Sequence, residues 1–109
     1  MLEIRYYIAA DGHRPFERWF AGLDPAARAK VTTAIVRLEQ GNISNAKGVG
    51  EGVLEYRINF GPGYRVYFGR DGDVLVILLT GGTKRRQQQE ITAAHEMWTD
   101  YRLRRRPKR

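Results

Sequence analysis

The chain has 109 residues, of which 42% are hydrophobic and 28% charged, enough for one domain with a modest core. It contains no cysteine, which excludes disulfides and thiolate metal sites and favours a reducing compartment, so we expect a cytoplasmic protein. The longest apolar run, residues 74–79, is too short to span a bilayer, and no N-terminal segment resembles a signal peptide, so we expect no membrane partner.

The formal net charge of +7 is concentrated at the C-terminus. Six of the 19 basic residues lie in positions 102–109, and removing them leaves 13 basic against 12 acidic residues. We therefore expect a single domain of residues 1–101 followed by a basic tail of residues 102–109. Such a tail is usually solvated and only sometimes contacts nucleic acid.

Residues 2–9 are predicted to form a first strand, which a turn at residues 11–13 ends. Apolar residues at helical spacing predict a short amphipathic helix over residues 15–22: Phe16, Trp19, Phe20 and Leu23. Asp24 as N-cap and Pro25 at the first helical position predict a second helix that ends at Gly41. These two helices form a hairpin that can cover one face of a sheet. Residues 42–52 are predicted to form an exposed glycine-rich loop with one cation, Lys47, which is either solvated or a ligand contact.

Residues 53–82 contain three strand-like runs separated by two turn sequences, which predicts an antiparallel meander. Apolar and polar residues alternate in the first two runs, so each of these strands has one core face and one outer face. The third run, residues 74–79, is apolar throughout and should be covered on both faces.

A three-residue loop at positions 61–63 would pair Phe60 with Tyr64 across the first hairpin. The same register gives these further pairs: Asn59 with Arg65, Ile58 with Val66, and Arg57 with Tyr67. The outer face would then carry two guanidinium groups and a phenol, which suits a phosphate ligand because arginine binds phosphate oxygens bidentately. The alternative is a solvated face on which Arg57 or Arg65 pairs with Glu55.

Residues 84–103 are predicted to form a C-terminal helix that Thr83 caps. Its first turn would hold Lys84, Arg85 and Arg86, which is unfavourable because the N-terminal end of a helix prefers acidic residues. A local conflict of this kind often marks a functional site.

The sequence contains no metal-ligand or phosphate-loop pattern, because His13 and His95 are isolated and the Gly48–Gly52 segment precedes a strand. We therefore expect no metal and no cofactor. RNA cleavage by attack of the 2′-hydroxyl on its own phosphate needs neither, since the enzyme must hold an in-line geometry, stabilise negative charge and move protons. The cationic cluster of Arg57, Arg65 and Lys84, with Tyr67 beside it, suits that chemistry.

The run from Gly52 to Gly69 resembles the signature of the HigB-like addiction-module killer proteins, which are toxins of the RelE/ParE superfamily in bacterial type II toxin–antitoxin systems. Segments at residues 15–19, 47–50, 81–84 and 98–101 follow in the order expected of this group. The resemblance implies an α+β, RelE-like fold of order β-α-α-β-β-β-α, in which a helical hairpin packs on one face of a small antiparallel meander. It also implies an mRNA interferase, an endoribonuclease that enters the ribosomal A site, cleaves the message and inhibits growth, together with a DNA-binding helix-turn-helix antitoxin as partner.

Within this resemblance, Arg65 in Gly-Tyr-Arg-Val-Tyr matches the phosphate-binding arginine of RelE-type enzymes, Arg57 matches an active-site lysine on a strand, and Lys84 matches the basic residue after the last strand. The C-terminal catalytic tyrosine of those enzymes has no clear counterpart, so Tyr67 is the candidate to orient or move a proton if its side chain points outward. The residues expected to contact RNA are Lys47, Asn59, Arg85 and Arg86. Two alternatives stay open: a ParE-like gyrase inhibitor, which shares the fold but lacks the basic cluster, and a catalytically weak RNA-binding relative.

Overall fold

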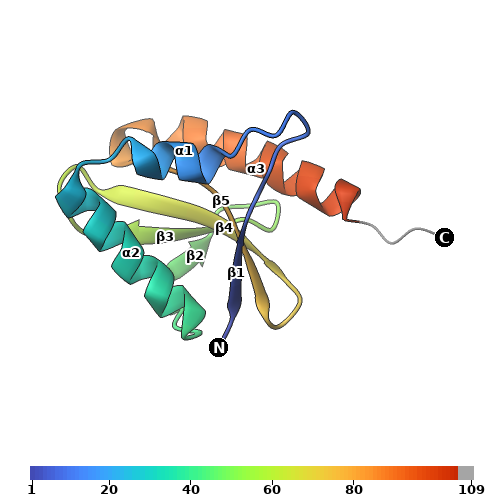
Figure 1. Ribbon diagram of the computed structural model, residues 1–109, viewed down its shortest axis with the longest axis horizontal. Coiled ribbons are helices and arrows are strands. Elements are labelled where there is room, and N and C mark those ends of the chain that lie inside the picture. Colours follow the sequence, from blue (N-terminus) through green and yellow to red (C-terminus); the bar gives the residue numbers. More distant parts are fainter. Residues whose placement is uncertain (106–109) are drawn as a thin grey trace.

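The computed structural model describes residues 1–105 and is of the α+β class (Figure 1). Its elements follow in the order β1 (Glu3–Tyr6), α1 (Pro15–Ala21), α2 (Pro25–Glu39), β2 (Ala46–Gly48), β3 (Leu54–Ile58), β4 (Tyr64–Asp71), β5 (Leu75–Thr83), the 3₁₀ turn η1 (Lys84–Arg86) and α3 (Gln87–Arg104). The five strands form one sheet of order β1-β5-β4-β3-β2, in which β1 runs parallel to β5 and all other neighbours are antiparallel. The predicted meander is therefore confirmed as β3-β4-β5.

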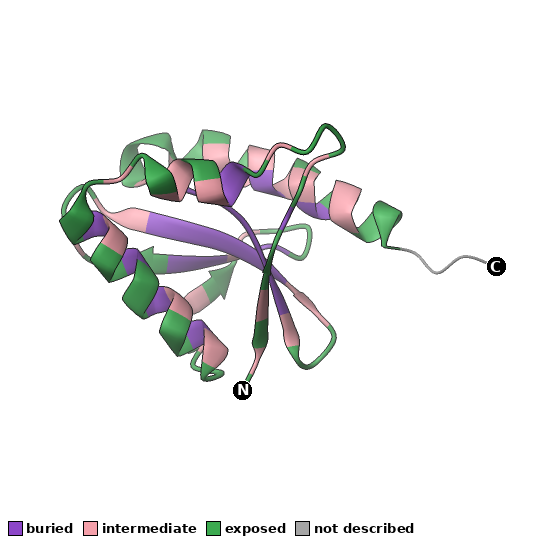
Figure 2. Ribbon diagram, viewed as in Figure 1, coloured by how far each residue is buried: buried purple, intermediate pink, exposed green. Residues whose placement is uncertain are grey.

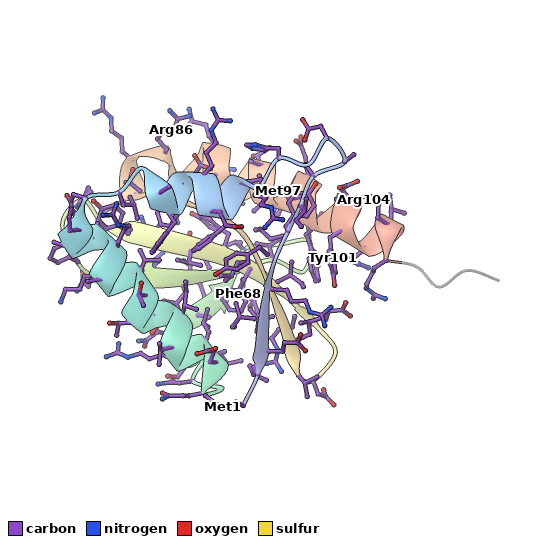
Figure 3. The ribbon with its side chains drawn as sticks, viewed as in Figure 1. Met1, Phe68, Arg86, Met97, Tyr101 and Arg104 are labelled. Atoms are coloured by element: carbon purple, nitrogen blue, oxygen red, sulfur yellow. The ribbon has the colours of Figure 1, made fainter. Side chains whose placement is uncertain are left out.

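The sheet separates two hydrophobic clusters. On one face, Phe16 of α1 and Val31 and Leu38 of α2 pack against Val66 and Phe68 of β4. On the other face, Ala94 and Trp98 of α3 pack against β4 and β5. Burial is concentrated in the central strands and on the inward sides of the helices (Figure 2). The side-chain view shows Phe68 in the interior of the molecule (Figure 3).

The two predicted helices of the hairpin are confirmed. The carboxylate of Asp24 accepts a hydrogen bond of 2.8 Å from the amide of Ala27, and Pro25 occupies the first helical position of α2. Trp19 and Phe20 pack against the core, as their spacing predicts. The predicted apolar run is covered on both faces over β5, because Val76 and Leu78 contribute to one cluster and Ile77 and Leu79 to the other. Val74 does not follow the prediction, since it precedes β5 and is exposed.

The predicted hairpin register is wrong by two residues. The observed pairs are Ile58 with Tyr64, Arg57 with Arg65, Tyr56 with Val66, and Glu55 with Tyr67. The reason is a loop of residues 59–63 rather than 61–63, in which Gly61 and Gly63 have φ of 56° and 82°. Because side chains alternate with a period of two, a slip of two leaves every residue on its predicted face.

The face that the alternation marks as outer is only partly exposed: α3 covers it at Glu55 and Tyr67, whereas Arg57 and Asn59 remain exposed. Gly69 of β4 makes this close approach possible, since a Cβ there would come within 2.5 Å of the Trp98 ring. The phenol of Tyr101 further ties α3 to the sheet by donating a hydrogen bond of 2.7 Å to Asp71. Glu55 and Tyr67 are consequently fully buried.

Four further features differ from those predicted. A short strand, β2, forms inside the stretch predicted to be a loop, because its backbone pairs with that of β3. The first strand covers only Glu3–Tyr6. Thr83 makes no side-chain cap, and the helix proper begins at Gln87 after the turn η1. Residues 102–104 of the predicted tail belong to α3, and residues 106–109 lie outside the described part of the chain.

Candidate functional site

A pocket of about 540 Å³ opens at the end of the sheet where the β3–β4 loop meets η1. Its lining residues come from the segment before β2, from β3, β4 and their loop, and from η1: Asn45, Arg57, Ile58, Asn59, Gly63, Tyr64, Arg65 and Lys84. The amide of Lys84 donates a hydrogen bond of 2.9 Å to the carbonyl oxygen of Gly63, which ties η1 to the hairpin loop. The pocket thus brings together three of the four predicted catalytic residues, Arg57, Arg65 and Lys84.

Arg65 forms the buried wall of this pocket. Its side chain is only 7% exposed, and its Nε and Nη1 atoms find no hydrogen-bond partner within residues 1–105. Its ion-pair partner is Glu55, whose Oε2 lies 3.9 Å from Nε and therefore beyond hydrogen-bond distance. A buried charged group without hydrogen bonds is costly, so this guanidinium is suited to receive an anion from the pocket side.

Glu55 lies beneath the two arginines and accepts three hydrogen bonds. Arg57 Nε donates to Oε1 at 3.1 Å, and the Tyr67 hydroxyl and Gln87 Nε2 each donate to Oε2 at 2.9 Å. Arg57 and Arg65 are direct cross-strand partners, an arrangement that is unfavourable for like charges. The carboxylate of Glu55 compensates for this repulsion, so the predicted alternative in which the arginines pair with Glu55 is observed for both.

The protonation of Glu55 follows from these contacts. Desolvation by burial acts to raise its pKa, but the hydrogen bonds from Gln87, Arg57 and Tyr67 and the charge of Arg65 together hold the pKa below its usual value. The residue is therefore an anion at neutral pH. A fixed negative charge under the pocket holds Arg57 Nε and offsets the charge of Arg65, while the Arg57 side chain remains half exposed to the pocket side.

Tyr67 is buried and lies outside the pocket lining, which corrects the expectation that its phenol faces a substrate. Desolvation, followed by the hydrogen bond to Glu55 and its charge, raises the pKa of Tyr67. The charge of Arg65 acts to lower this pKa but is outweighed, because the phenol is buried and donates its hydrogen bond to an anionic carboxylate. Tyr67 therefore orients Glu55.

The residues expected to contact RNA are only partly gathered at this site. Asn59 lines the pocket. Lys47 is exposed on β2, paired in register with Glu55, and does not line the pocket. Arg85 and Arg86 are exposed on η1 outside the pocket, and Arg86 Nε lies 3.8 Å from a carboxylate oxygen of Glu90.

Sequence reasoning did not identify Gln87 as part of this network. The alternation of β3 was sufficient to place Glu55 beside Arg57. No local pattern indicates Gln87, because its contact depends on how α3 docks across the sheet.

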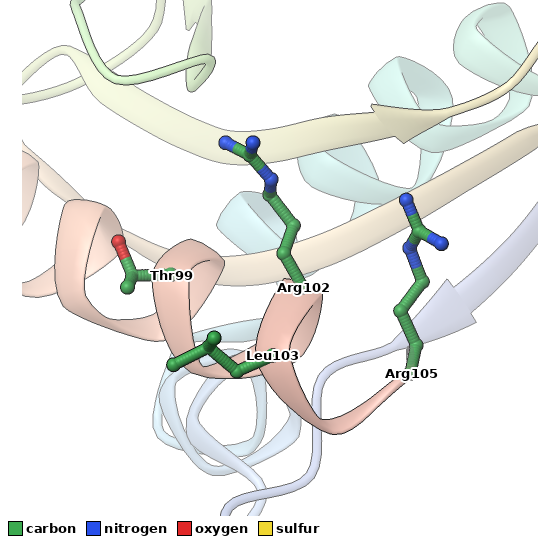
Figure 4. A pocket seen from close by; sticks show the side chains of 4 residues that line it. All are labelled: Thr99, Arg102, Leu103 and Arg105. Atoms are coloured by element: carbon green, nitrogen blue, oxygen red, sulfur yellow. The ribbon is translucent and has the colours of Figure 1, made fainter. Parts of the chain in front are cut away.

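A smaller hollow lies on the last turns of α3, where Arg102 and Arg105 extend from the same side of the helix (Figure 4). Arg105 is already paired with Asp71 at 3.2 Å, so this hollow is less suited to bind an anion. Within residues 1–105, no three histidine, cysteine, aspartate or glutamate side chains gather as metal ligands. None of the described helices has both the length and the apolar character that a membrane span requires.

Fold and pocket together define a small α+β protein with a cation-lined pocket suited to an anionic ligand. The chain belongs to the family described as phage derived protein Gp49-like (DUF891), whose model matches residues 18–99. This is a toxin–antitoxin-associated family related to RelE-like toxins, and membership implies an antitoxin partner. The chain is also 44% identical over 80 residues to an uncharacterised protein of Haemophilus influenzae, a match that covers 72% of this chain and 81% of the relative.

Proposed function

We propose that this chain is the toxin of a type II toxin–antitoxin pair and that it cleaves mRNA in the ribosomal A site in the manner of HigB and RelE. The single observation that carries the proposal is the buried, incompletely hydrogen-bonded guanidinium of Arg65 in a pocket that also contains Arg57 and Lys84. Three cations around one hollow match the charge that develops on a phosphate during cleavage.

In the proposed reaction, the 2′-hydroxyl oxygen of the RNA attacks the adjacent phosphorus while the bond to the 5′-oxygen breaks, which leaves a 2′,3′-cyclic phosphate and a 5′-hydroxyl. Arg65 and Arg57 bind the two non-bridging oxygens, because a guanidinium fork matches phosphate geometry. Lys84 is exposed at the rim and stabilises or protonates the departing 5′-oxygen. The proton of the 2′-hydroxyl leaves to water, since Tyr67 is too deeply buried to accept it.

The pocket contains no histidine, which supports a dependence on the ribosome. Histidine is the side chain best matched to proton transfer at neutral pH, and without it the isolated enzyme would be slow. A ribosome that holds the message in an in-line geometry would increase the rate of cleavage. For the same reason, a catalytically weak RNA-binding relative is the second candidate function.

The antitoxin is proposed to be a helix-turn-helix DNA-binding protein that silences the toxin and represses their common operon.

The test is to express the wild-type chain, Arg65→Ala and Lys84→Ala in cells and to map mRNA 5′ ends. We expect cuts in phase with the reading frame that disappear in Arg65→Ala and weaken in Lys84→Ala. Arg18→Ala is the matched control, because Arg18 is an exposed arginine of α1 outside the pocket. Circular dichroism of each purified variant checks folding, which matters most for the buried Arg65.

Full activity in Arg65→Ala would refute the role of that residue. Ribosome binding without any cuts would favour the RNA-binding relative. Growth arrest with intact mRNA and broken DNA would instead indicate a gyrase poison.

A further inference from the structure

A second cavity, of about 300 Å³, adjoins the phosphate pocket along the edge of β3. The two share four lining residues: Asn45, Arg57, Ile58 and Asn59. The edge is open here because β2 pairs with β3 only as far as Tyr56. One cavity therefore lies toward α2 and the other toward η1, on either side of an unpaired stretch of backbone.

The helix α2 presents one polar face to this second cavity, which we call the α2 cavity. Lys30, Thr33 and Arg37 line it, at a spacing that puts them on one side of a helix. Lys30 and Arg37 are exposed, and neither forms an ion pair with a carboxylate of residues 1–105. The ammonium of Lys30 lies 5.3 Å from the centre of the Phe60 ring, which also lines the cavity. Two cations without neutralising acids thus face the same hollow.

The floor of the α2 cavity carries a further hydrogen-bonding group. Tyr56 lines it, is 2% exposed, and its hydroxyl has no hydrogen-bond partner within the described chain. Most buried hydroxyls in folded proteins are paired, so this group has the capacity to donate to a ligand oxygen. An exposed pair of cations above a buried, unpartnered hydroxyl is a site for an anion that carries oxygen acceptors.

We propose that the α2 cavity binds the backbone phosphate next to the scissile one on the same RNA strand, with Lys30 and Arg37 as its cations and Tyr56 as a hydrogen-bond donor. The inference rests on the proposed function, since it assumes that RNA is the ligand of the adjoining pocket. A strand that crosses the open edge at Arg57 and Asn59 then places one phosphate in each cavity. The enzyme then binds the RNA backbone through phosphates on both sides of this edge.

The test compares two uncleavable 2′-O-methyl RNAs by NMR titration of the purified chain: a dinucleotide with one internal phosphate and a trinucleotide with two. We expect the trinucleotide to bind the wild type about fivefold more tightly, as for one further exposed charge-assisted contact. The variant Lys30→Ala/Arg37→Ala should lose this gain while its dinucleotide affinity stays unchanged. Arg18→Ala should keep the gain, and Tyr56→Phe should lose part of it. The salt dependence of trinucleotide binding should also become shallower in the double variant.

An equal gain in the wild type and the double variant, or no gain in the wild type, would overturn the inference. Both side chains are exposed on α2, so the double variant should fold, and its circular dichroism spectrum verifies this. Failure here together with Arg65-dependent cleavage in cells would leave the proposed function standing. A trinucleotide gain without cleavage would instead retain the α2 cavity and refute the nuclease.

Discussion

The substitution Glu55→Gln tests whether a buried carboxylate compensates for the two cross-strand arginines. It keeps the shape of the side chain but removes its charge, so Arg65, whose side chain is 7% exposed, loses its ion-pair partner. Removing one member of a buried ion pair typically costs about 3–5 kcal/mol. Arg57 adds little to this cost because its side chain is 49% exposed and water can solvate it. The 3.9 Å separation from Arg65 places the expected loss near the lower end, at about 3 kcal/mol.

A loss of this size is large for a small domain, whose total stability is about 5–15 kcal/mol. The assay is urea denaturation at pH 7, monitored by circular dichroism. The control is Glu96→Gln, because Glu96 is an exposed acid on α3. The control should lie within about 0.5 kcal/mol of the wild type. A Glu55→Gln protein that is equally close to the wild type would refute the reasoning, since the arginines would then need no counter-charge.

Glu55 also determines how the stability of the fold depends on pH. Because the folded state holds the pKa of Glu55 below its usual value of 4.5, the carboxylate stabilises the fold above that pH, and this contribution is lost as the pH falls through the lowered pKa. The wild type should therefore lose its advantage over Glu55→Gln on acidification below about pH 4.5, and the two denaturation midpoints should converge. Parallel curves down to pH 3 would contradict the assignment.

Three further substitutions test other parts of the structure. Tyr67→Phe should keep mRNA cleavage within a few-fold of the wild type and reduce stability by about 1 kcal/mol, since the phenol only donates to Glu55; a loss of cleavage in a folded variant would restore Tyr67 as a proton carrier. Gly69→Ala should destabilise the fold by about 1–3 kcal/mol in a thermal melt because its methyl group would meet the Trp98 ring, and adding Trp98→Leu should recover part of this loss. Burial and the hydrogen bond to Asp71 raise the pKa of Tyr101 to about 12, so Tyr101→Phe should remove a phenol that ionises well above the usual value of 10.0 in an absorbance titration and reduce stability by about 1 kcal/mol.

The sequence was sufficient to predict the helical hairpin, the meander and the grouping of Arg57, Arg65 and Lys84. Each of these depends on local information: the spacing of apolar residues, the capping Asp24, and an alternation that survives a register error of two. The predicted cross-strand pairs of the β3–β4 hairpin were wrong. The two glycines of its loop adopt left-handed conformations, which lengthen the loop to residues 59–63.

The parts that could not be predicted depend on tertiary packing. The face that contains Tyr67 looks like a solvent face in the sequence, and only the docking of α3 buries Tyr67 itself. The hydrogen bond from Gln87 to Glu55 and the pairing of β2 with β3 likewise join segments whose contact no local pattern indicates. The predicted position of Tyr67 on the strand was therefore correct. Its predicted role was wrong because α3 covers the side chain.

The end of β5 is approached closely from both sides of the sheet. A Cβ at Gly81 would come within 2.3 Å of the Trp19 ring of α1, and a Cβ at the next residue, Gly82, would come within 2.6 Å of Glu90 of α3. With no side chains to act as spacers, both helices rest almost directly on the backbone that leads into Lys84. This stretch should therefore have little freedom to open by itself, and its amide protons should exchange with deuterium at the rate of whole-molecule unfolding. The pocket rim at η1 is therefore attached to a rigid strand end rather than to a mobile loop.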